Sequence, residues 1–129
     1  MPFNKLHVPT GTPAETCHRI SDELHESLVN TCGVSDEDDF SLVCRYDPDD
    51  MLFHPTFLGV RNPANTIVIE ITLLEGRTEE QKEALYQDVR RRLGELGLDP
   101  SSSIVFLNEN RAIDWSFGPE GSVKHVLGL

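Results

Sequence analysis

The residue with the greatest chemical potential in this chain is Pro2. Removal of the initiator Met1 would leave the nitrogen of Pro2 as a secondary amine at the start of an expected strand. Such an amine can take a proton from carbon, return one, or polarise a carbonyl group, and burial and neighbouring charges decide which role it plays near neutral pH. Many chains begin with Met-Pro without chemical consequence, so the rest of the sequence must supply partners for this amine.

Four further residues could take part in chemistry, and each has a plainer interpretation. Arg77 stands just before an expected helix, where the positive end of the helix dipole disfavours a cation, which hints at an anion-related role; otherwise it is a surface arginine. Asp38 belongs to an Asp-Glu-Asp-Asp run, and such runs are usually solvated loops. Trp115 and Phe117 could wall a pocket or anchor a core or an interface.

Composition and charge narrow the classes of partner. Only 11 Lys and Arg residues face 22 Asp and Glu residues, and the formal net charge is −11, which argues against nucleic-acid and anionic-membrane partners. The first eight residues lack the basic start and apolar stretch of a signal peptide, and three cysteines without a CxxC spacing suit a reducing compartment. We therefore expect a cytoplasmic protein. Five histidines include no HxH or HxxxH spacing, so no metal site is expected.

The elements that must position these residues follow from hydrophobic periodicity. Strands are expected at residues 2–8, 40–46, 66–74 and 103–108. Thr10 or Thr12, the latter with Glu15 in a capping box, would begin a first helix that ends at Gly33, and its apolar stripe is Cys17, Ile20, Leu24, Leu28 and Thr31. Thr78 and Gln81 would form the capping box of a second helix, with a stripe of Leu85, Val89, Leu93 and Leu96, that ends at Gly97. Residues 51–65 contain three turn-forming residues and predict a hairpin or loop.

The order of these elements suggests a tandem duplication. Placing Pro2 on Val68 brings Thr12 onto Thr78, an offset of 66 residues, and gives two β-α-β repeats at residues 2–50 and 66–110. We predict one α/β (α+β) domain over residues 1–129, with a four-stranded sheet that is parallel within each repeat and two helices on one face. The other sheet face would be buried between subunits. The tail at 111–129 either packs on a neighbouring subunit or closes its own sheet as a hairpin.

The amino-terminal proline, the duplicated β-α-β unit and the arginine after the third strand together resemble the tautomerase superfamily. Within it, the chain is most similar to the malonate semialdehyde decarboxylase-like family. The motifs that carry this likeness are Gly33-Val34 followed by residues 38–40, the run Arg77-Thr-Glu-Glu-Gln-Lys82, Glu109-Asn110, and the stretch Asp114-Trp-Ser-Phe-Gly118. The resemblance spans essentially the whole chain and implies a homotrimer that uses no metal or organic cofactor.

The same resemblance implies roles for the candidate residues. Pro2 would be the catalytic amine, Asp38 its acidic partner and Arg77 the ligand of the substrate carboxylate, while Trp115 and Phe117 would wall the pocket. One position departs from the pattern, because the decarboxylases carry a second arginine where this chain has Glu75, and the related dehalogenases carry theirs where it has Leu74. Either the substrate is held differently, or another arginine substitutes; the candidates are Arg45, Arg61 and Arg111.

The expected function is that of a cofactor-independent lyase or isomerase acting on a small 3-oxo or 2-oxo carboxylic acid. A cationic Pro2 would stabilise the enolate left by decarboxylation, the reaction first expected, and a neutral Pro2 would act as the base of keto-enol tautomerisation. Asp38 could also activate water for a hydratase. The alternatives are a phenylpyruvate-type tautomerase, a haloacrylate hydratase or dehalogenase, and a non-catalytic trimeric protein that binds small acids.

Overall fold

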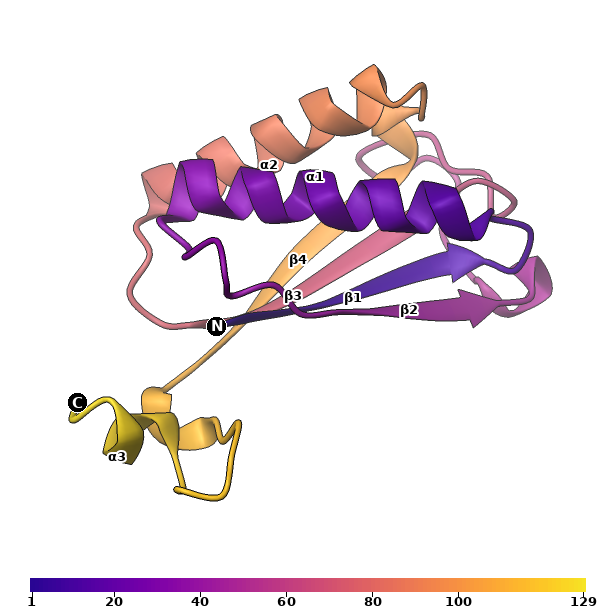
Figure 1. Cartoon of the computed structure of the whole chain (residues 1–129). Coiled ribbons are helices and arrows are strands. Elements are labelled where there is room, and N and C mark those ends of the chain that lie inside the picture. Colours follow the sequence, from indigo (N-terminus) through magenta and orange to yellow (C-terminus); the bar gives the residue numbers. More distant parts are fainter.

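The computed structural model describes all 129 residues and has a four-stranded sheet at its centre (Figure 1). The strands are β1 (Pro2–Pro9), β2 (Ser41–Tyr46), β3 (Ile67–Leu74) and β4 (Ser103–Asn110), in the order β2-β1-β3-β4. The pairs β1–β2 and β3–β4 are parallel, and β1 and β3 meet as antiparallel central strands. The predicted sheet, parallel within each repeat, is therefore confirmed, with strand bounds within two residues of those expected.

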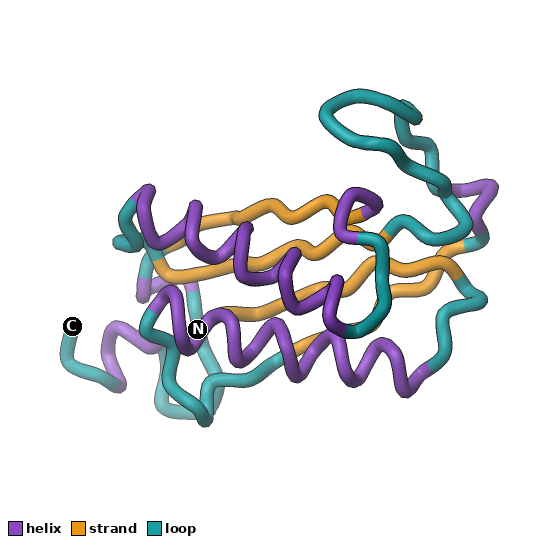
Figure 2. Tube along the Cα trace, turned by 90° about the horizontal axis from the view of Figure 1, so that it is seen from above, coloured by secondary structure: helices purple, strands orange, loops and turns teal.

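Two long helices, α1 (Ala14–Cys32) and α2 (Glu79–Glu95), cover one face of this sheet side by side (Figures 1 and 2). Alternate side chains of the two central strands point toward them, and Leu6, Val8, Ile69, Ile71 and Leu73 are completely buried. Both predicted helical stripes contribute to the same core, although Cys32 rather than Thr31 ends the stripe of α1. A single hydrophobic core thus lies between the helices and the sheet.

The two repeats are related by a slightly different offset from the one expected. The strands begin at residues 2 and 67 and the helices at 14 and 79, so both pairs are separated by 65 residues. Pro2 therefore corresponds to Ile67, not Val68. The buried side chains of β1 and β3 match only with this offset, because a shift of one residue moves every side chain of a strand to the other face.

The helix ends show which local signals hold. Thr78 caps α2 as predicted, since its hydroxyl accepts a hydrogen bond from the Gln81 N–H and the Gln81 side chain accepts one from the Thr78 N–H. The predicted threonine cap of α1 is wrong: Pro13 is the N-cap and provides no side-chain hydrogen bond. Proline fixes its own φ near the helical value but has no side-chain acceptor. Gly33 ends α1 with a left-handed φ of 67°, as expected.

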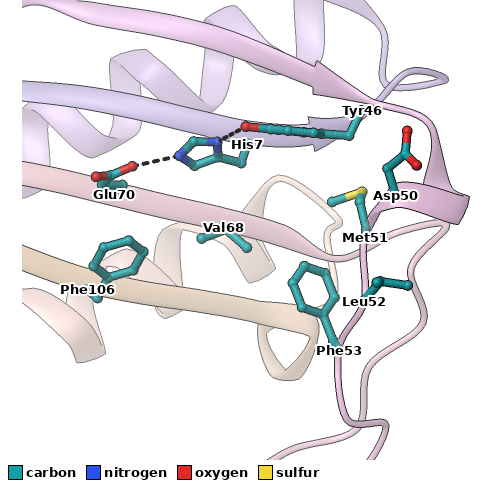
Figure 3. Close-up of a pocket in the computed structure, with 9 residues that line it drawn as sticks. All are labelled: His7, Tyr46, Asp50, Met51, Leu52, Phe53, Val68, Glu70 and Phe106. Atoms are coloured by element: carbon teal, nitrogen blue, oxygen red, sulfur yellow. Dashed lines mark hydrogen bonds and ion pairs between the residues drawn. The ribbon is translucent and has the colours of Figure 1, made fainter.

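The sheet face opposite the helices is only partly covered. A pocket of about 330 Å³ lies on this face. Figure 3 shows His7 in this pocket between Tyr46 and Glu70. Its Nδ1 is 2.7 Å from the Tyr46 hydroxyl and its Nε2 is 2.8 Å from a carboxylate oxygen of Glu70. The hydrogen bond from His7 lowers the pKa of Glu70 below its usual range. Exposed apolar side chains, among them Leu42 and Phe106, lie on the same face. Such a face suits a contact with another subunit, and its burial there stays a prediction.

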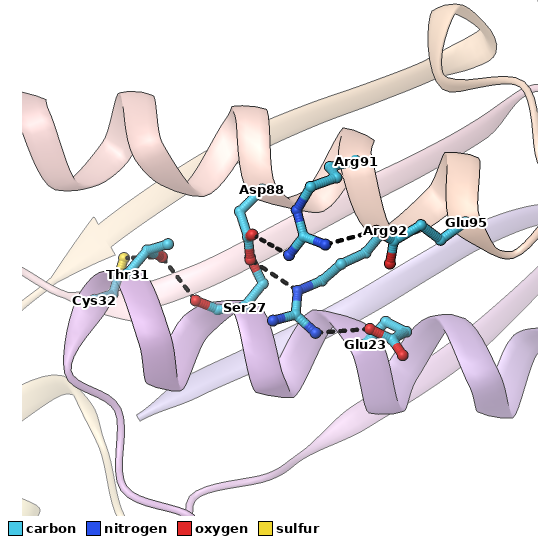
Figure 4. Close-up of polar contacts among 8 residues, drawn as sticks. All are labelled: Glu23, Ser27, Thr31, Cys32, Asp88, Arg91, Arg92 and Glu95. Carbon is cyan, nitrogen blue, oxygen red and sulfur yellow. Dashed lines mark hydrogen bonds and ion pairs between the residues drawn. The ribbon is translucent and has the colours of Figure 1, made fainter.

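A cluster of charged side chains joins the two helices on their outer side (Figure 4). Arg92 of α2 donates to Glu23 of α1 at 2.7 Å and to Asp88 of its own helix at 2.8 Å, and Arg91 donates to Asp88 and Glu95. Burial by itself would raise the pKa of Asp88. Hydrogen bonds from Arg92 and then Arg91 outweigh this effect and lower the pKa to about 2. Asp88 is therefore the shared acceptor on which this cluster depends.

We expect Asp88→Asn to lower the free energy of unfolding at pH 7 by about 1–2 kcal/mol, because each of two guanidinium groups loses one of its two carboxylate partners. The lowered pKa of about 2 means that Asp88 stabilises the fold at pH values above its ordinary 3.8, and this contribution disappears as pH falls toward 2. Urea denaturation from pH 7 to pH 2.5 should show the two proteins converging. Glu95→Gln, which removes one exposed pair, is the control and should change nothing measurable. A constant difference down to pH 2.5 would contradict this account.

The connections and the tail complete the chain. Three short 3-10 helices, η1 (Pro48–Asp50), η2 (Pro100–Ser102) and η3 (Ala112–Asp114), punctuate the loops, and residues 51–65 form the loop before β3. After β4 the tail runs beyond the edge of the sheet and ends with the short helix α3 (Val123–Val126), yellow in Figure 1. It adds no strand to the sheet and has only one isolated bridge, between Gly118 and Gly121, so a hairpin closing its own sheet is not formed. None of the helices has the length and apolar character needed to cross a membrane.

Candidate active site

Four segments meet at one end of the sheet: the start of β1, the connection from α1 to β2, the turn after β3 and the tail (Figure 1). Between three of them lies a cavity of about 490 Å³, lined by Met1, by residues of the 35–40 connection and by tail residues between 117 and 127. Because β1 and β3 are antiparallel, the start of the first and the end of the second must share this end of the sheet. The topology therefore brings the amino terminus close to Arg77.

The amino group of the chain is held by Asp38. The Met1 ammonium forms an ion pair with the Asp38 carboxylate, and the Asp38 N–H donates to the Ser35 carbonyl at 3.0 Å in the turn that presents it. Burial, and secondly the positive charge of Arg77, lower the pKa of this amino group from 8.0 to about 6. The contact with Asp38 favours the charged form and opposes this shift. Burial and Arg77 thus favour the neutral form of this amino group, whereas Asp38 favours its charged form.

Pro2 is completely buried and pairs with Leu73 at the first position of β1. While Met1 is present, the Pro2 nitrogen is a peptide nitrogen without basicity. Loss of Met1 would move the free amine inward by one residue, about 3.8 Å, to the Pro2 ring. Removal of Met1 would therefore create the predicted amine one residue away from the nitrogen on which Asp38 and Arg77 now act.

Arg77 is anchored to the backbone of two elements. Its Nε donates to the Cys32 carbonyl at 3.2 Å, near the end of α1, and its Nη1 donates to the Leu74 carbonyl at 3.1 Å. Carbonyl groups at a helix C-terminus attract cations, which explains a half-buried arginine at this position. Only Nη2 has no hydrogen-bond partner in the protein, so a carboxylate can approach this atom first. A bidentate contact through Nε and Nη2 would require Arg77 to release the Cys32 carbonyl group.

The aromatic residues form a connected row beside the cavity. Phe117 lines the cavity and packs at a ring-centroid distance of 5.2 Å on Phe40 and 5.8 Å on Trp115. Trp115 is buried behind Phe117, where its indole N–H donates to the Asn110 side chain, so it supports the wall and does not line it. Phe40 was missed as a wall residue because the sequence places it only at the start of a strand.

The cavity of one subunit is acidic. Glu37, Asp38 and Glu120 line it, and no Lys or Arg does. Glu75, which stands where a second arginine was expected, is exposed on the turn. Among the proposed substitutes, Arg45 pairs with Val8 at the far end of the sheet and donates to the Thr12 carbonyl at 2.6 Å. 

The other two arginines proposed as substitutes lie at opposite ends of the sheet. Arg61 lies in the loop before β3, at the far end with Arg45, whereas Arg111 follows β4 and lies at the end of the sheet that holds the cavity. Of the three candidates, only Arg111 therefore lies at the same end of the sheet as the cavity, although it does not line it. The structure contains no group of three or more His, Cys, Asp or Glu side chains placed to hold a metal ion.

Asn4 is a further polar residue at this end that sequence reasoning missed. It is 1% exposed, two residues from Pro2 on the same face of β1, and its side-chain oxygen has no hydrogen-bond partner. An unpaired buried oxygen costs free energy, so such a group usually has a role outside packing. The available signal was a single amide within an otherwise apolar face formed by Pro2, Leu6 and Val8.

A duplicated β-α-β sheet with the amino end of the chain, a carboxylate and a guanidinium at one edge is the architecture of the tautomerase superfamily. A family model described as "Tautomerase enzyme" matches residues 38–118, more than half of the chain. The protein belongs to this family. The chain is also 32% identical over 119 residues to the probable tautomerase YusQ of Bacillus subtilis, covering 92% of this chain and 94% of that protein.

Solved structures agree with this assignment. The chain is 28% identical to FG41 malonate semialdehyde decarboxylase inhibited by 3-bromopropiolate, with a TM-score of 0.87 over 98% of this chain and 95% of the other. It is equally similar in sequence to a malonate semialdehyde decarboxylase described for its decarboxylase and hydratase activities, with a TM-score of 0.85 and coverages of 98% and 97%. A fused 4-OT, solved as an asymmetric trimer, is 25% identical with a TM-score of 0.76 and coverages of 98% and 99%.

Proposed function

We propose that this protein is a cofactor-independent enzyme in which the amine of Pro2 transfers a proton at the carbon next to the carbonyl group of a small oxo carboxylic acid. One observation carries this proposal: the amino end of the chain and Asp38 form an ion pair at the wall of a cavity of about 490 Å³, close enough to Arg77 for its charge to act on the amino group. Membership of the tautomerase family supports the same class of chemistry.

Each group has a distinct part in the proposed reaction. A neutral Pro2 nitrogen accepts the proton from the α-carbon, and the electron pair of the broken C–H bond moves toward the carbonyl oxygen to give the enolate. Asp38 stabilises the ammonium group that forms, and Arg77 binds the substrate carboxylate through Nη2. The same proton then returns to the oxygen, which completes the keto-enol conversion. Phe117 excludes water from one side, which strengthens these charge interactions.

Decarboxylation is the second candidate, and the likeness to two malonate semialdehyde decarboxylases favours it. In this reaction a protonated Pro2 donates a hydrogen bond to the 3-oxo group while the C–C bond to the carboxylate breaks. Carbon dioxide leaves, the electron pair forms an enolate, and the enolate carbon takes a proton to give the aldehyde. A hydratase reaction would need Asp38 to accept a proton from water. We place tautomerisation before decarboxylation because this chain has Glu75 at the position of the second arginine of the decarboxylases. The carboxylate that leaves as carbon dioxide would therefore have only one arginine to bind it.

We further propose that the working form is a trimer. The solved fused 4-OT relative is a trimer, and the uncovered sheet face exposes Leu42 and Phe106 at 50% and 40%. The cavity of a single subunit has three carboxylates and no basic side chain in its lining, a poor environment for an anion. In this trimer a neighbouring subunit would have to supply the positive charge that the lining of the cavity lacks.

The dependence of activity on pH distinguishes the two reactions. Burial and, secondly, Arg77 lower the pKa of the Met1 amino group to about 6. We expect the same two influences to lower the pKa of an amine at Pro2, so kcat/KM for phenylpyruvate should rise with pH as that amine loses its proton. Decarboxylation of malonate semialdehyde needs the protonated amine, so its kcat/KM should fall over the same range. Both are measured with product identification, alongside 3-haloacrylates. Binding of these acids without turnover of any would leave only the small-acid-binding alternative.

A further inference from the structure

A second cavity, of about 340 Å³, lies at the opposite end of the sheet from the amino terminus. It is enclosed between the loop before β3, the helix α2 and the start of β4; the loop is the large teal one at the edge of the molecule in Figure 2. Its lining comprises Leu58, Gly59 and Arg61 of the loop, Arg90 of α2, Pro100 and Ser101 of η2, and the first three residues of β4. Two guanidinium groups thus share one cavity whose lining contains no carboxylate.

Arg61 is fixed in position by the loop that it holds together. Its Nη1 donates to the carbonyl groups of Phe57 and Gly59, the latter at 3.3 Å, and its backbone N–H donates to the Pro55 carbonyl at 2.9 Å. A β-carbon at Gly59 would lie 3.2 Å from the Ser101 carbonyl, so the loop rests closely on η2. The Nε of Arg61 is buried without a partner, and Nη2 has none in the protein. The guanidinium is therefore held in place with donors left over.

Arg90 is similarly short of partners. Its Nη1 and Nη2 reach the carbonyl groups of Tyr86 and Ser103, both at the long distance of 3.4 Å. None of the ion pairs in the molecule includes Arg61 or Arg90, although acids outnumber basic residues by two to one. Asp99, at the start of η2, forms no ion pair with either arginine, and its Oδ1 accepts hydrogen bonds from the N–H and hydroxyl of Ser101. The positive charge of this cavity is therefore not neutralised by the protein itself.

We propose that this cavity binds a small organic oxyanion, with its phosphoryl or carboxylate group between Arg61 and Arg90. Guanidinium groups bind oxyanions through paired N–H donors, and two that face one cavity without an acid repel each other until an anion lies between them. The cavity is much larger than a bare inorganic ion, and Leu58, Ile104 and Val105 offer an apolar wall for the rest of the ligand. Because it lies at the far end of the sheet from Pro2, this site is independent of the proposed catalytic chemistry.

Calorimetric titration of the full chain tests the proposal, with butyl phosphate, butyrate and inorganic phosphate as probes at low ionic strength. We expect millimolar or tighter binding of at least one organic probe, and Arg90→Gln should weaken it by about tenfold, the loss of a charge-assisted pair. Arg91→Gln removes the same charge from the next residue of α2, which is half exposed and paired with Asp88 and Glu95, and should change the affinity less than twofold. The stronger organic probe identifies the head group.

Several outcomes would overturn the proposal: no binding of either organic probe, equal weakening by Arg90→Gln and Arg91→Gln, or inorganic phosphate binding as tightly as both organic probes. Arg61 holds its loop through backbone carbonyl groups, so the second variant is the conservative Arg61→Lys, which keeps the charge but loses the paired N–H donors. This variant should weaken binding of the probe while its melting temperature equals that of Arg91→Gln. Titrating the Pro2→Ala variant keeps the two sites distinguishable, because its affinity for the probe should be unchanged.

Discussion

Replacing Pro2 by alanine is expected to lower kcat/KM by about 100- to 10,000-fold, the range that a positioned general acid or base contributes. Alanine leaves a primary amine that can rotate freely, whereas the proline ring fixes the direction of its nitrogen at the start of β1. The measurement is steady-state turnover of whichever oxo acid the wild-type protein converts. Intact mass must show that Met1 is absent from both proteins, because a retained Met1 turns the Pro2 nitrogen into an amide.

The matched control is Pro55→Ala, an exposed proline in the loop at the other end of the molecule, which should leave turnover unchanged. Equal activity of the wild-type and Pro2→Ala proteins would exclude the amine from the chemistry. Turnover by a preparation that retains Met1 in full would lead to the same conclusion, since no basic nitrogen would then lie at this position.

The second large effect is expected from Arg77→Ala, which should reduce kcat/KM by about 100-fold through loss of a charge-assisted bond to the substrate carboxylate. The loss should fall mainly on KM if Arg77 binds the ground state and the transition state equally, and on kcat if its contact strengthens during the reaction. Arg77 also binds the Cys32 and Leu74 carbonyl groups, so the melting temperature must be followed in parallel.

Two variants separate binding from support. Arg77→Lys keeps the charge and should recover part of the lost activity, whereas Arg91→Ala removes an exposed positive charge on α2 and should have no effect on turnover. If Arg77→Ala lowers the melting temperature but leaves kcat/KM unchanged, the guanidinium serves only to hold the end of α1 to the turn after β3.

The features that the sequence predicted correctly depend on neighbouring residues. The Thr78 and Gln81 capping box, the alternation in β3 and the apolar stripes of both helices are each determined within a few positions along the chain. The cap of α1 failed because two threonines and a proline compete within four residues, and the proline position decides the outcome. The offset of 66 failed for a similar reason, since it matched residue types where only the alternation of buried side chains fixes the register.

The site depends on contacts between distant segments, and there the sequence was less informative. Asp38 and Arg77 were placed near the amino end through the likeness to a family, and the structure brings both to the Met1 amino group. The tail is positioned by the packing of Phe117 on Phe40, across more than seventy residues, which no local pattern encodes. Glu120 and Phe40 were missed in consequence, as residues whose role arises only when the tail has packed.

The antiparallel meeting of the two repeats has a consequence for how many reactive ends a chain can possess. The counterpart of Pro2 is Ile67, whose nitrogen is joined to Thr66 by a peptide bond and can never become a free amine. If two ancestral copies were fused, only the first would keep a free amino-terminal nitrogen. The corresponding end of the second copy could then no longer transfer protons through such a group. Arg61, in the loop before β3, instead gives the cavity at this end of the sheet a positive charge.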